Sequence, residues 1–423
     1  MEQKKGTGGV MGSTPLVALS CLFISGCFGP PAMNRALLQY DQSLVQAQTE
    51  LLLVNIARLK EGLPLHFIVT GQISAAFDFT ARAGATATLA ESASTTNKYV
   101  LDLSATVSEK PTLTFAPLQG KDYGERFFSP LSDKFLFFGH RRGPDTFPML
   151  RLMARGFDDL TVGTEGWYPN DPDDDQYVKF RQLVLHLEAL ALAGQLYIDR
   201  LHYLVEVLRI PPVEPPKAGD LITASEKGYK WQKIDESTFA LQKRIEGIPS
   251  LTNFDPKDEN ILTDRDKMEI HKAVELFEND FVYVELRPTE INRWPLKGYF
   301  RLRSLRDIFL FLAKDVENER PVDPDSRTQF ILKKDPKKTP RNPVFALEIK
   351  KGSQAPPGEP YAISYKGIWF WIPIIPRDPS SQQEKVQTDW NKDIFLILYN
   401  IFQMSVVDTS KLLAPPILTI PAR

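Results

Sequence analysis

The residue types that most often perform chemistry in proteins are sparse and widely separated in this sequence. Its histidines show no pair at the i, i+4 spacing that brings two imidazoles to one metal ion; they are His66, His140, His186, His202 and His271. The motifs of phosphate-binding loops, dinucleotide-binding folds and serine hydrolases are absent. Scattered residues can still assemble a catalytic triad, so the missing motifs lower the expectation of hydrolysis without excluding it. The sequence predicts no catalytic, cofactor-binding or metal residue and favours a non-enzymatic role.

A short acidic segment is the other place where oxygen ligands gather, with aspartates at positions 171, 173, 174 and 175. A calcium-binding EF-hand loop would also need a central glycine and a distal glutamate, and both are missing. The segment stands directly before a predicted long helix, where carboxylates accept hydrogen bonds from free backbone N–H groups and favour the helix dipole. We therefore interpret these aspartates as helix-capping and solvated residues rather than as a calcium site.

One spacing near the N-terminus indicates a specific covalent modification. An apolar run at 16–24 follows Lys4 and Lys5, and Ile24-Ser25-Gly26 stands directly before Cys27. A charged segment, a short apolar run and small residues are typical of a secretory signal peptide, and the run is too short to span a bilayer. The last four residues resemble the bacterial lipobox. That resemblance implies diacylglycerol transfer to the Cys27 thiol, cleavage before Cys27 and acylation of the new amine.

We therefore predict a signal peptide over 1–26 and lipid attachment at Cys27, whose acyl chains hold the mature protein on a membrane. Cys21 is a second candidate, although Leu19 stands where a small residue is preferred. An ordinary signal peptide with an incidental cysteine is the alternative. Phe28, rather than aspartate, follows Cys27, which favours the outer membrane of a bacterial cell envelope. A net charge of −2 offers no basic excess for nucleic acid.

Apolar periodicity predicts the elements of the first half of the chain. Residues 27–33 form a Gly/Pro tether, and helical spacing predicts two long helices over 34–61 and 176–208. A period of two over 65–82 and 100–108 predicts an antiparallel pair of strands. The prolines of IPPVEPP at 210–216 predict a semi-rigid spacer. They divide the mature chain into an N-terminal region over 34–209 and a C-terminal region over 217–423.

The remaining segments mix strands and helices without a regular βαβ order. We predict helices over 146–160, 263–278, 304–316 and 389–402, and strands over 229–241, 281–286, 344–349 and 361–375. This order is typical of the α+β class, with antiparallel strands packed against several helices, two of them long. Within it, Trp369, Phe370 and Trp371 lie in the densest apolar stretch outside the signal peptide. A buried strand explains them most simply, and an exposed surface for a partner is the alternative.

Several sequence blocks together resemble an uncharacterised family of bacterial lipoproteins of the outer-membrane type. The blocks are LLVNIAR at 52–58 with Pro64 and Phe67, KPTLTFAPLQG at 110–120, RSL at 303–305, YKGIWFW at 365–371 and APPILTIP at 414–421. They span nearly the whole mature chain. The chain departs from the family pattern at 376–385, where a shorter polar turn is expected. The resemblance implies an envelope lipoprotein and supplies no activity or catalytic residue.

The predicted lipid attachment and the absence of catalytic motifs together predict a lipid-anchored envelope protein. We expect it to have a binding or scaffolding role, with an envelope protein as its partner. Two alternatives make different structural predictions. An envelope hydrolase of cell-wall or glycan substrates would hold two carboxyl groups about 5–10 Å apart in a deep cleft. A periplasmic carrier of lipids or small ligands would enclose a large apolar cavity between the sheet and the long helices.

Overall fold

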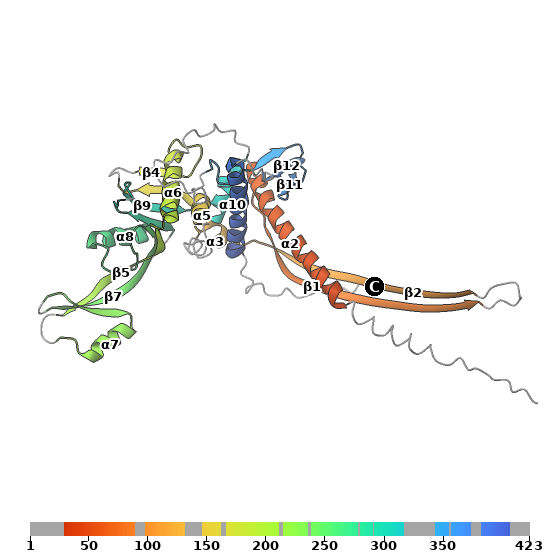
Figure 1. The fold of residues 1–423 in the computed structure, drawn as a ribbon, viewed down its shortest axis with the longest axis horizontal. Coiled ribbons are helices and arrows are strands. Elements are labelled where there is room, and N and C mark those ends of the chain that lie inside the picture. The colour runs from red at the N-terminus through yellow and green to blue at the C-terminus, as the bar shows by residue number, and fades with distance from the viewer. Residues whose placement is uncertain are drawn as a thin grey trace, which may run out of the picture.

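The computed structural model describes residues 29–88, 98–131, 146–161, 166–210, 215–235, 238–277, 280–290, 292–316, 343–354, 357–373 and 382–406. Its helices are α2 (Gly29–Lys60), α3 (Lys121–Phe128), α5 (Thr146–Met153), α6 (Tyr177–Leu192), α7 (Ala218–Glu226), α8 (Asp264–Phe277), α9 (Leu305–Asp315) and α10 (Gln382–Val406). Helices and largely antiparallel strands are interspersed along the chain (Figure 1), so the predicted α+β class is confirmed.

The largest sheet combines strands from both sides of the proline-rich segment at 210–216. Its order is β4-β3-β9-β8-β7-β5, with β6 pairing on β7, and only the β7–β8 pair among them is parallel. These strands are β3 (Ala154–Asp159), β4 (Gly166–Pro169), β5 (Tyr197–Ile210), β6 (Tyr229–Lys233), β7 (Phe239–Thr252), β8 (Phe281–Leu286) and β9 (Leu296–Leu302). One sheet therefore draws on both regions that the prolines were predicted to divide.

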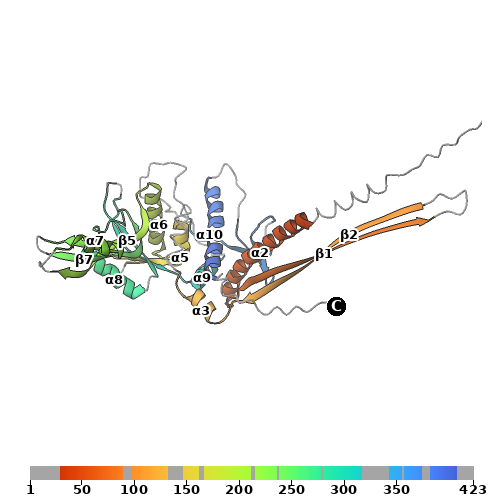
Figure 2. The same cartoon turned by 90° about the horizontal axis from the view of Figure 1, so that it is seen from below.

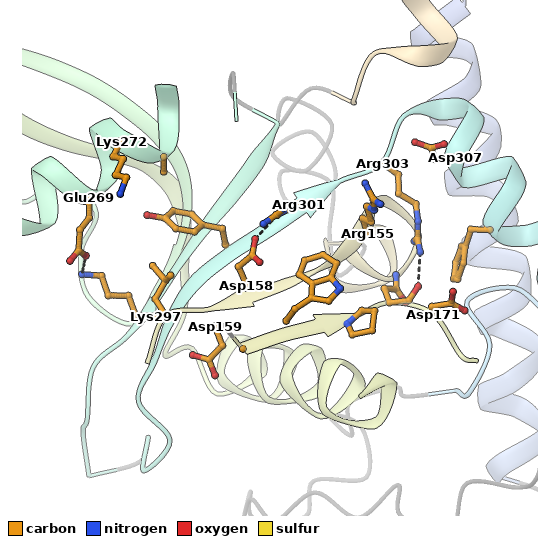
Figure 3. Close-up of a pocket in the computed structure, with 18 of the residues that line it drawn as sticks. Arg155, Asp158, Asp159, Asp171, Glu269, Lys272, Lys297, Arg301, Arg303 and Asp307 are labelled. Carbon is orange, nitrogen blue, oxygen red and sulfur yellow. Dashed lines mark hydrogen bonds and ion pairs between the residues drawn. The ribbon is translucent and has the colours of Figure 1, made fainter. Parts of the chain in front are cut away.

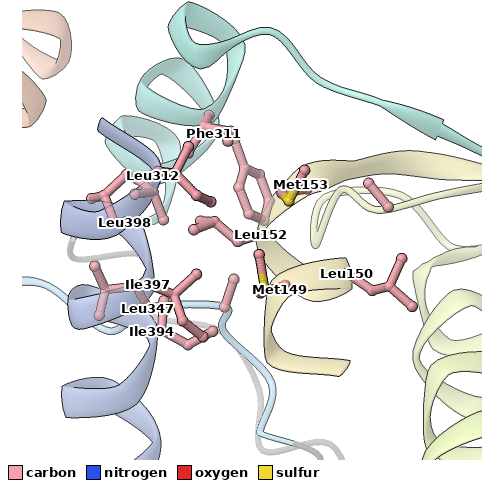
Figure 4. Packing of buried hydrophobic residues seen from close by; sticks show 14 of the residues in the cluster. Met149, Leu150, Leu152, Met153, Phe311, Leu312, Leu347, Ile394, Ile397 and Leu398 are labelled. Atoms are coloured by element: carbon pink, nitrogen blue, oxygen red, sulfur yellow. The ribbon is translucent and has the colours of Figure 1, made fainter. Parts of the chain in front are cut away.

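A smaller sheet lies beside the first and last long helices and has the order β10-β12-β11. Its strands are β10 (Lys350–Gly352), β11 (Ala362–Tyr365) and β12 (Ile368–Trp371). Between this sheet and the large one, buried apolar side chains of α5, α9 and α10 form the centre of the main core. Figure 4 shows this packing, with Leu152, Leu312 and Leu398 among its fully buried members.

The first long helix is confirmed and begins earlier than predicted. α2 starts at Gly29, so residues 29–33 of the predicted tether are helical. Its C-terminal part is held in the main core by a buried stripe at Leu52, Leu53, Ile56 and Ala57. Gly62, just after the helix, has a φ of 71°, and the Leu63 N–H donates to the carbonyl oxygen of Arg58 at 2.8 Å. A left-handed glycine that closes such bonds ends a helix.

The predicted antiparallel pair is confirmed as one long hairpin formed by β1 (Ile68–Thr88) and β2 (Lys98–Pro117). It leaves the body of the protein in the same general direction as α2 and extends beyond the described end of that helix (Figures 1 and 2). Phe67 holds its base, because this buried ring packs against three aromatic rings from other segments, with centroids 4.8–5.3 Å away: Phe127, Phe309 and Phe402.

The second long helix was predicted wrongly. α6 ends at Leu192, and residues 197–210 form strand β5. Gly194 adopts a φ of 69°, and the Gln195 N–H donates to the carbonyl oxygen of Leu190 at 2.8 Å, which closes the helix end. The apolar run continues past this stop, so composition alone suggested one helix. The other long helix is instead α10, which is longer than the predicted 389–402.

Two further segments also differ from prediction. The predicted helix over 146–160 is α5 followed by strand β3. The predicted strand at 344–349 pairs with no other described strand, because α10 side chains bind its backbone. The Trp390 Nε1–H donates to the carbonyl oxygen of Ala346 at 2.8 Å, and the Glu348 N–H donates to Asn391 Oδ1 at 3.3 Å. The predicted strand over 229–241 is β6 and the start of β7, and the strands predicted over 281–286 and 361–375 are β8 and the pair β11 and β12. The remaining predicted helices are α8, α9 and α10, whereas strand β9 was not predicted.

Candidate functional site

The structure separates the residues that the sequence singled out. Cys27 lies outside the described residues. Trp369, Phe370 and Trp371 form β12, which is the central strand of its sheet, so both of its edges are occupied by β10 and β11. Phe370 is 1% exposed and belongs to the main core, whereas the two tryptophans are half-buried. Any partner would therefore reach Trp369 and Trp371 but not Phe370.

The described histidines do not meet one another. His186 is buried on α6, where its Nε2 lies 2.9 Å from Asn292 Oδ1, and burial lowers its pKa to about 4, so it is neutral at pH 7. His202 lies on β5, and His271 lies on α8 with Nε2 3.4 Å from Glu275 Oε1. His140 lies outside the described residues. Within the described part of the chain, no group of three or more His, Cys, Asp or Glu gathers as a metal site.

The predicted acidic segment has local structural roles. The Gln176 N–H, just before α6, donates to Asp174 Oδ1 at 2.8 Å. Lys314 Nζ on α9 donates to Asp171 Oδ2 at 3.0 Å. Burial alone would raise the pKa of Asp171, but the hydrogen bond from Lys314 outweighs it and the pKa is lowered. Asp171 therefore joins the end of β4 to α9, a contact that sequence reasoning did not foresee.

A charged cleft of about 1380 Å³ lies between the large sheet and helices α8 and α9. Strands β3, β4 and β9 supply one wall, and the two helices supply the others (Figure 3). Most of its lining residues are charged, and both signs are present: Arg155, Asp158, Asp159, Asp171, Arg265, Asp266, Glu269, Lys272, Lys297, Arg301, Arg303, Asp307 and Lys314. This charged cleft is the candidate functional site.

The alternation of β9 explains why charged residues line the cleft. Leu296, Phe300 and Leu302 face the main core and are nearly fully buried. The intervening positions face the cleft and α8; they are Lys297, Tyr299 and Arg301. Successive strand residues point to opposite faces, so the sequence LKGYFRL builds a core face and a polar face together.

An ion-pair group joins α8 to the sheet inside the cleft. Lys297 Nζ lies 2.8 Å from Asp266 Oδ1 and 2.6 Å from Glu269 Oε2. Asp266 also accepts hydrogen bonds from the backbone N–H and hydroxyl of Thr263, at 2.9 and 2.6 Å, which form the cap of α8. Burial would raise the pKa of Asp266, but these hydrogen bonds lower it to about 2. Asp266 is therefore ionised at every physiological pH.

Two arginines reinforce the opposite wall. Arg301 pairs with Asp158 on the neighbouring strand, and its guanidinium lies 5.2 Å from the ring centroid of Trp167. Arg303 is buried and donates to the carbonyl oxygens of Leu152 at 3.1 Å and Asn170 at 2.6 Å. Burial lowers its pKa to about 10, which still leaves it charged at pH 7. These hydrogen bonds and the ion pair hold the wall in place, so the shape of the cleft is preorganised.

Two cationic side chains of the cleft have no ion-pair partner among the described residues. Arg155 on β3 and Lys272 on α8 are exposed, and no described residue forms an ion pair with either side chain. Of the other lysines and arginines that line the cleft, those at positions 265, 297, 301 and 314 each have an acidic neighbour within 4.0 Å, and Arg303 is buried and donates to backbone carbonyl oxygens. The cleft thus offers two cations to a ligand that carries negative charge.

The electrostatics of the cleft suit binding better than acid–base catalysis. A glycoside hydrolase needs one carboxylic acid with a raised pKa, so that it is protonated when it meets substrate. The cleft carboxyl groups whose pKa values shift all move downwards: Asp171, Asp266 and Glu269. For Glu269 the largest cause is the hydrogen bond from Lys297. Such groups remain ionised and paired, which favours a fixed charged surface.

The carrier alternative predicts an apolar cavity between the sheet and the long helices. A pocket of about 520 Å³ lies between α2, α10 and strand β11, and its lining combines apolar side chains such as Val45, Leu53 and Phe395 with polar ones such as Gln42. Pockets for small ligands commonly have volumes of about 300–1,000 Å³. The carrier alternative therefore stays a prediction.

Sequence reasoning missed the charged cleft because its residues come from five elements between β3 and α9. The alternating charges of β9 were the available signal, but they identify a polar strand face and not what lies opposite. None of the described helices is both long enough and apolar enough to cross a membrane. Comparisons with protein-family models, curated proteins and solved structures found no significant match.

Proposed function

We propose that this chain is a lipid-anchored protein of the bacterial cell envelope that binds or scaffolds an envelope protein partner. Cys27 carries the acyl chains, and the outer membrane is the proposed location. The resemblance to uncharacterised envelope lipoproteins agrees with this proposal, as does the lipobox-like sequence before Cys27.

The charged cleft is the observation that supports a binding role. Asp171, Asp266 and Glu269 have lowered pKa values and are each paired with a lysine. Arg155 and Lys272 are exposed without a described ion-pair partner. A surface of this kind selects its partner by electrostatic complementarity. We therefore propose that an acidic segment of the partner enters the cleft and contacts these two cations.

The helix α2 connects the proposed lipid anchor to the body of the protein. It starts at Gly29, two positions after Cys27, and its 32 residues span about 48 Å at 1.5 Å per residue. Its far end is buried in the main core. A rigid helix, rather than a flexible tether, would then set the distance between the bilayer and the body.

The test is crosslinking in intact cells followed by affinity purification of the full chain. Replacing Arg155 and Lys272 with glutamate should lower recovery of the specific partner at least fivefold, because like charges repel an acidic segment. Lys392→Glu on the exposed surface of α10 is the matched control and should leave recovery unchanged. If the wild-type chain recovers no protein above background, the binding role is wrong.

The anchor is tested separately with labelled palmitate and membrane fractionation. Cys27→Ser should abolish incorporation and release the chain from the lipid-anchored fraction. If Cys27→Ser still incorporates palmitate, Cys27 is not the attachment site. Cys21→Ser would then be the next variant to measure.

A further inference from the structure

The register of the β1–β2 hairpin places its odd-numbered and even-numbered residues on opposite faces. Beyond an irregularity between Thr70 and Ile73, odd-numbered residues of β1 pair with odd-numbered residues of β2, from Ile73 with Leu113 to Ala87 with Tyr99. Even-numbered residues pair with even-numbered ones in the same way. Because strand positions alternate between the two faces of a sheet, each face collects one set.

The two sets differ sharply in chemistry. Odd positions from 73 to 87 read Ile, Ala, Phe, Phe, Ala, Ala, Ala and Ala, and those from 99 to 113 read Tyr, Leu, Leu, Ala, Val, Glu, Pro and Leu. Even positions from 74 to 88 read Ser, Ala, Asp, Thr, Arg, Gly, Thr and Thr, and those from 98 to 112 read Lys, Val, Asp, Ser, Thr, Ser, Lys and Thr. One face is therefore apolar apart from Glu109, and the other is predominantly polar.

The uninterrupted apolar part of this face has the length of a membrane. It runs from position 77 to 87 on β1 and from 99 to 107 on β2. Ten steps of about 3.3 Å cover about 33 Å along the strand. At the usual tilt of about 40° this gives a height of about 25 Å, which matches the apolar band of membrane-spanning strands.

Aromatic residues stand at both ends of that band. Phe77 and Phe79 lie towards the base of the hairpin, and Tyr99 lies next to its tip. Membrane-spanning strands carry aromatic girdles at both lipid–water boundaries. Glu109, which pairs with Phe77, is the first charged residue on this face and marks where the apolar band ends.

No other described strand pairs with the hairpin. In the described part of the chain, β1 and β2 form a two-stranded sheet on their own, so each strand has one outer edge that no other described strand pairs. The hairpin projects beyond the body in both views (Figures 1 and 2). A lone two-stranded hairpin is at best marginally stable, and strand edges without hydrogen bonds are not tolerated in lipid.

We infer that the β1–β2 hairpin enters a lipid bilayer together with the hairpins of further copies of this chain. The outer edges of neighbouring hairpins pair, so that the strands close into a ring with no open edge. The apolar face contacts lipid and the polar face lines the interior. Closed sheets that span membranes have at least about eight strands, so at least about four copies take part.

The direction of α2 agrees with this arrangement. Its N-terminal end lies on the side of the body from which the hairpin projects (Figures 1 and 2). Acyl chains on Cys27, as proposed above, would therefore enter the bilayer on the side where the hairpin does. This agreement rests on the proposed anchor, but the face and length arguments do not.

The experiment places single cysteines in the hairpin of the full Cys21→Ser chain and reads their surroundings in native-composition vesicles. A fluorophore is attached at Ala81, Ala83 or Ala85 on the apolar face, and at Thr80, Arg82 or Thr86 on the polar face. Nitroxide-labelled lipids should quench the odd positions at least threefold more than the even ones. Equal quenching at both sets, or none, would overturn the inference.

Assembly is measured on the same preparations by native mass spectrometry in mild detergent. The wild-type chain should give a closed oligomer of at least about four copies. Replacing Ala83 and Ala85 with aspartate should reduce it at least tenfold, because charge on the lipid face opposes insertion. Thr80 and Thr86 changed to aspartate are the matched control on the polar face and should retain the oligomer.

Other outcomes separate this inference from rival explanations. A water-soluble dimer without lipid quenching would mean that the apolar faces of two copies pack on each other, and would overturn the membrane assignment. Repeating the quenching with Cys27→Ser distinguishes the two proposals. Alternation without palmitate would sustain the hairpin inference alone, whereas palmitate without alternation in the wild-type chain would sustain the anchor alone.

Discussion

Lys297 is the cation through which α8 is held against the sheet. Asp266 has a pKa of about 2 in the folded protein, below the ordinary value of 3.8, so the folded state binds fewer protons than the unfolded chain between these values. Its stabilisation is complete above about pH 4 and is lost as the pH falls towards 2. Lys297→Met should lower the free energy of unfolding by about 1–2 kcal/mol at pH 7 and flatten its decline between pH 4 and 2. Urea denaturation at several pH values measures both effects.

A surface ion pair provides the control for this prediction. Lys121 Nζ lies 3.4 Å from Glu125 Oε1 on α3, but both side chains are largely exposed, so water screens the pair. Lys121→Met should change stability by less than about 0.5 kcal/mol. Equal effects of the two substitutions would show that the Lys297 pairing adds nothing specific.

At the scale of elements, Asn55 joins α2 to the start of the hairpin. Its amide donates to the carbonyl oxygens of Leu51 at 2.8 Å and His66 at 2.9 Å, and its Oδ1 accepts from the His66 N–H at 2.8 Å. Asn55→Leu would leave the backbone groups of His66 without these partners, at a cost of about 2–4 kcal/mol in the free energy of unfolding. Urea unfolding of the purified chain measures this loss.

Ser43→Ala is the matched change on the exposed part of the same helix. The Ser43 hydroxyl donates only to the carbonyl oxygen of Gln39, one turn away, so its loss should cost less than about 0.5 kcal/mol. A small effect at Asn55 would mean that water replaces the lost hydrogen bonds. The asparagine within the LLVNIAR block would then need another explanation.

Sequence periodicity predicted the elements whose signals were local. α2, the hairpin, α8 and α9 were predicted correctly because their apolar spacing is a local signal. The cap of α9 is local as well, since Ser304 Oγ accepts the Asp307 N–H. Residues 176–208 failed because the apolar run continued across Gly194. The predicted strand at 344–349 failed because Trp390 and Asn391, more than forty residues away, bind its backbone. Long-range partners of this kind leave no trace in local spacing.

At the scale of the whole molecule, one core joins segments on both sides of 210–216. Leu152, Phe300 and Leu398 belong to the same buried cluster although they come from α5, β9 and α10. We therefore expect one cooperative unfolding transition, with coincident curves from circular dichroism, tryptophan fluorescence and calorimetry. Leu398→Ala should destabilise the chain by about 2–5 kcal/mol and shift all three curves together.

Leu396→Ala, on the exposed face of α10, serves as the control and should shift them little. Two separated transitions, with only one of them moved by Leu398→Ala, would contradict a shared core. That result would instead favour independent folding of the regions 34–209 and 217–423.

The charged cleft could be predicted from sequence only in fragments. The alternation of Lys297, Tyr299 and Arg301 could have indicated a polar strand face, and Asp171 was interpreted only as a capping or solvated residue. Nothing local indicated that α8 and α9 would lie opposite this face. Cleft geometry depends on the pairing of β3 with β9, which lies far from β3 and β4 in the sequence. The sequence shows which residues are charged but does not show which of them lie close together in the fold.

The strict pairing of odd with odd positions in the hairpin also limits how its sequence can change over evolutionary time. Deleting one residue between 73 and 88 would exchange the chemical character of the two faces for every position on one side of the deletion. Tolerated length changes should therefore occur as two-residue steps, as compensating changes in both strands, or in the tip between Thr88 and Lys98. Among homologous sequences, insertions and deletions within the strands of this hairpin should therefore involve even numbers of residues, because only these keep each residue on its original face.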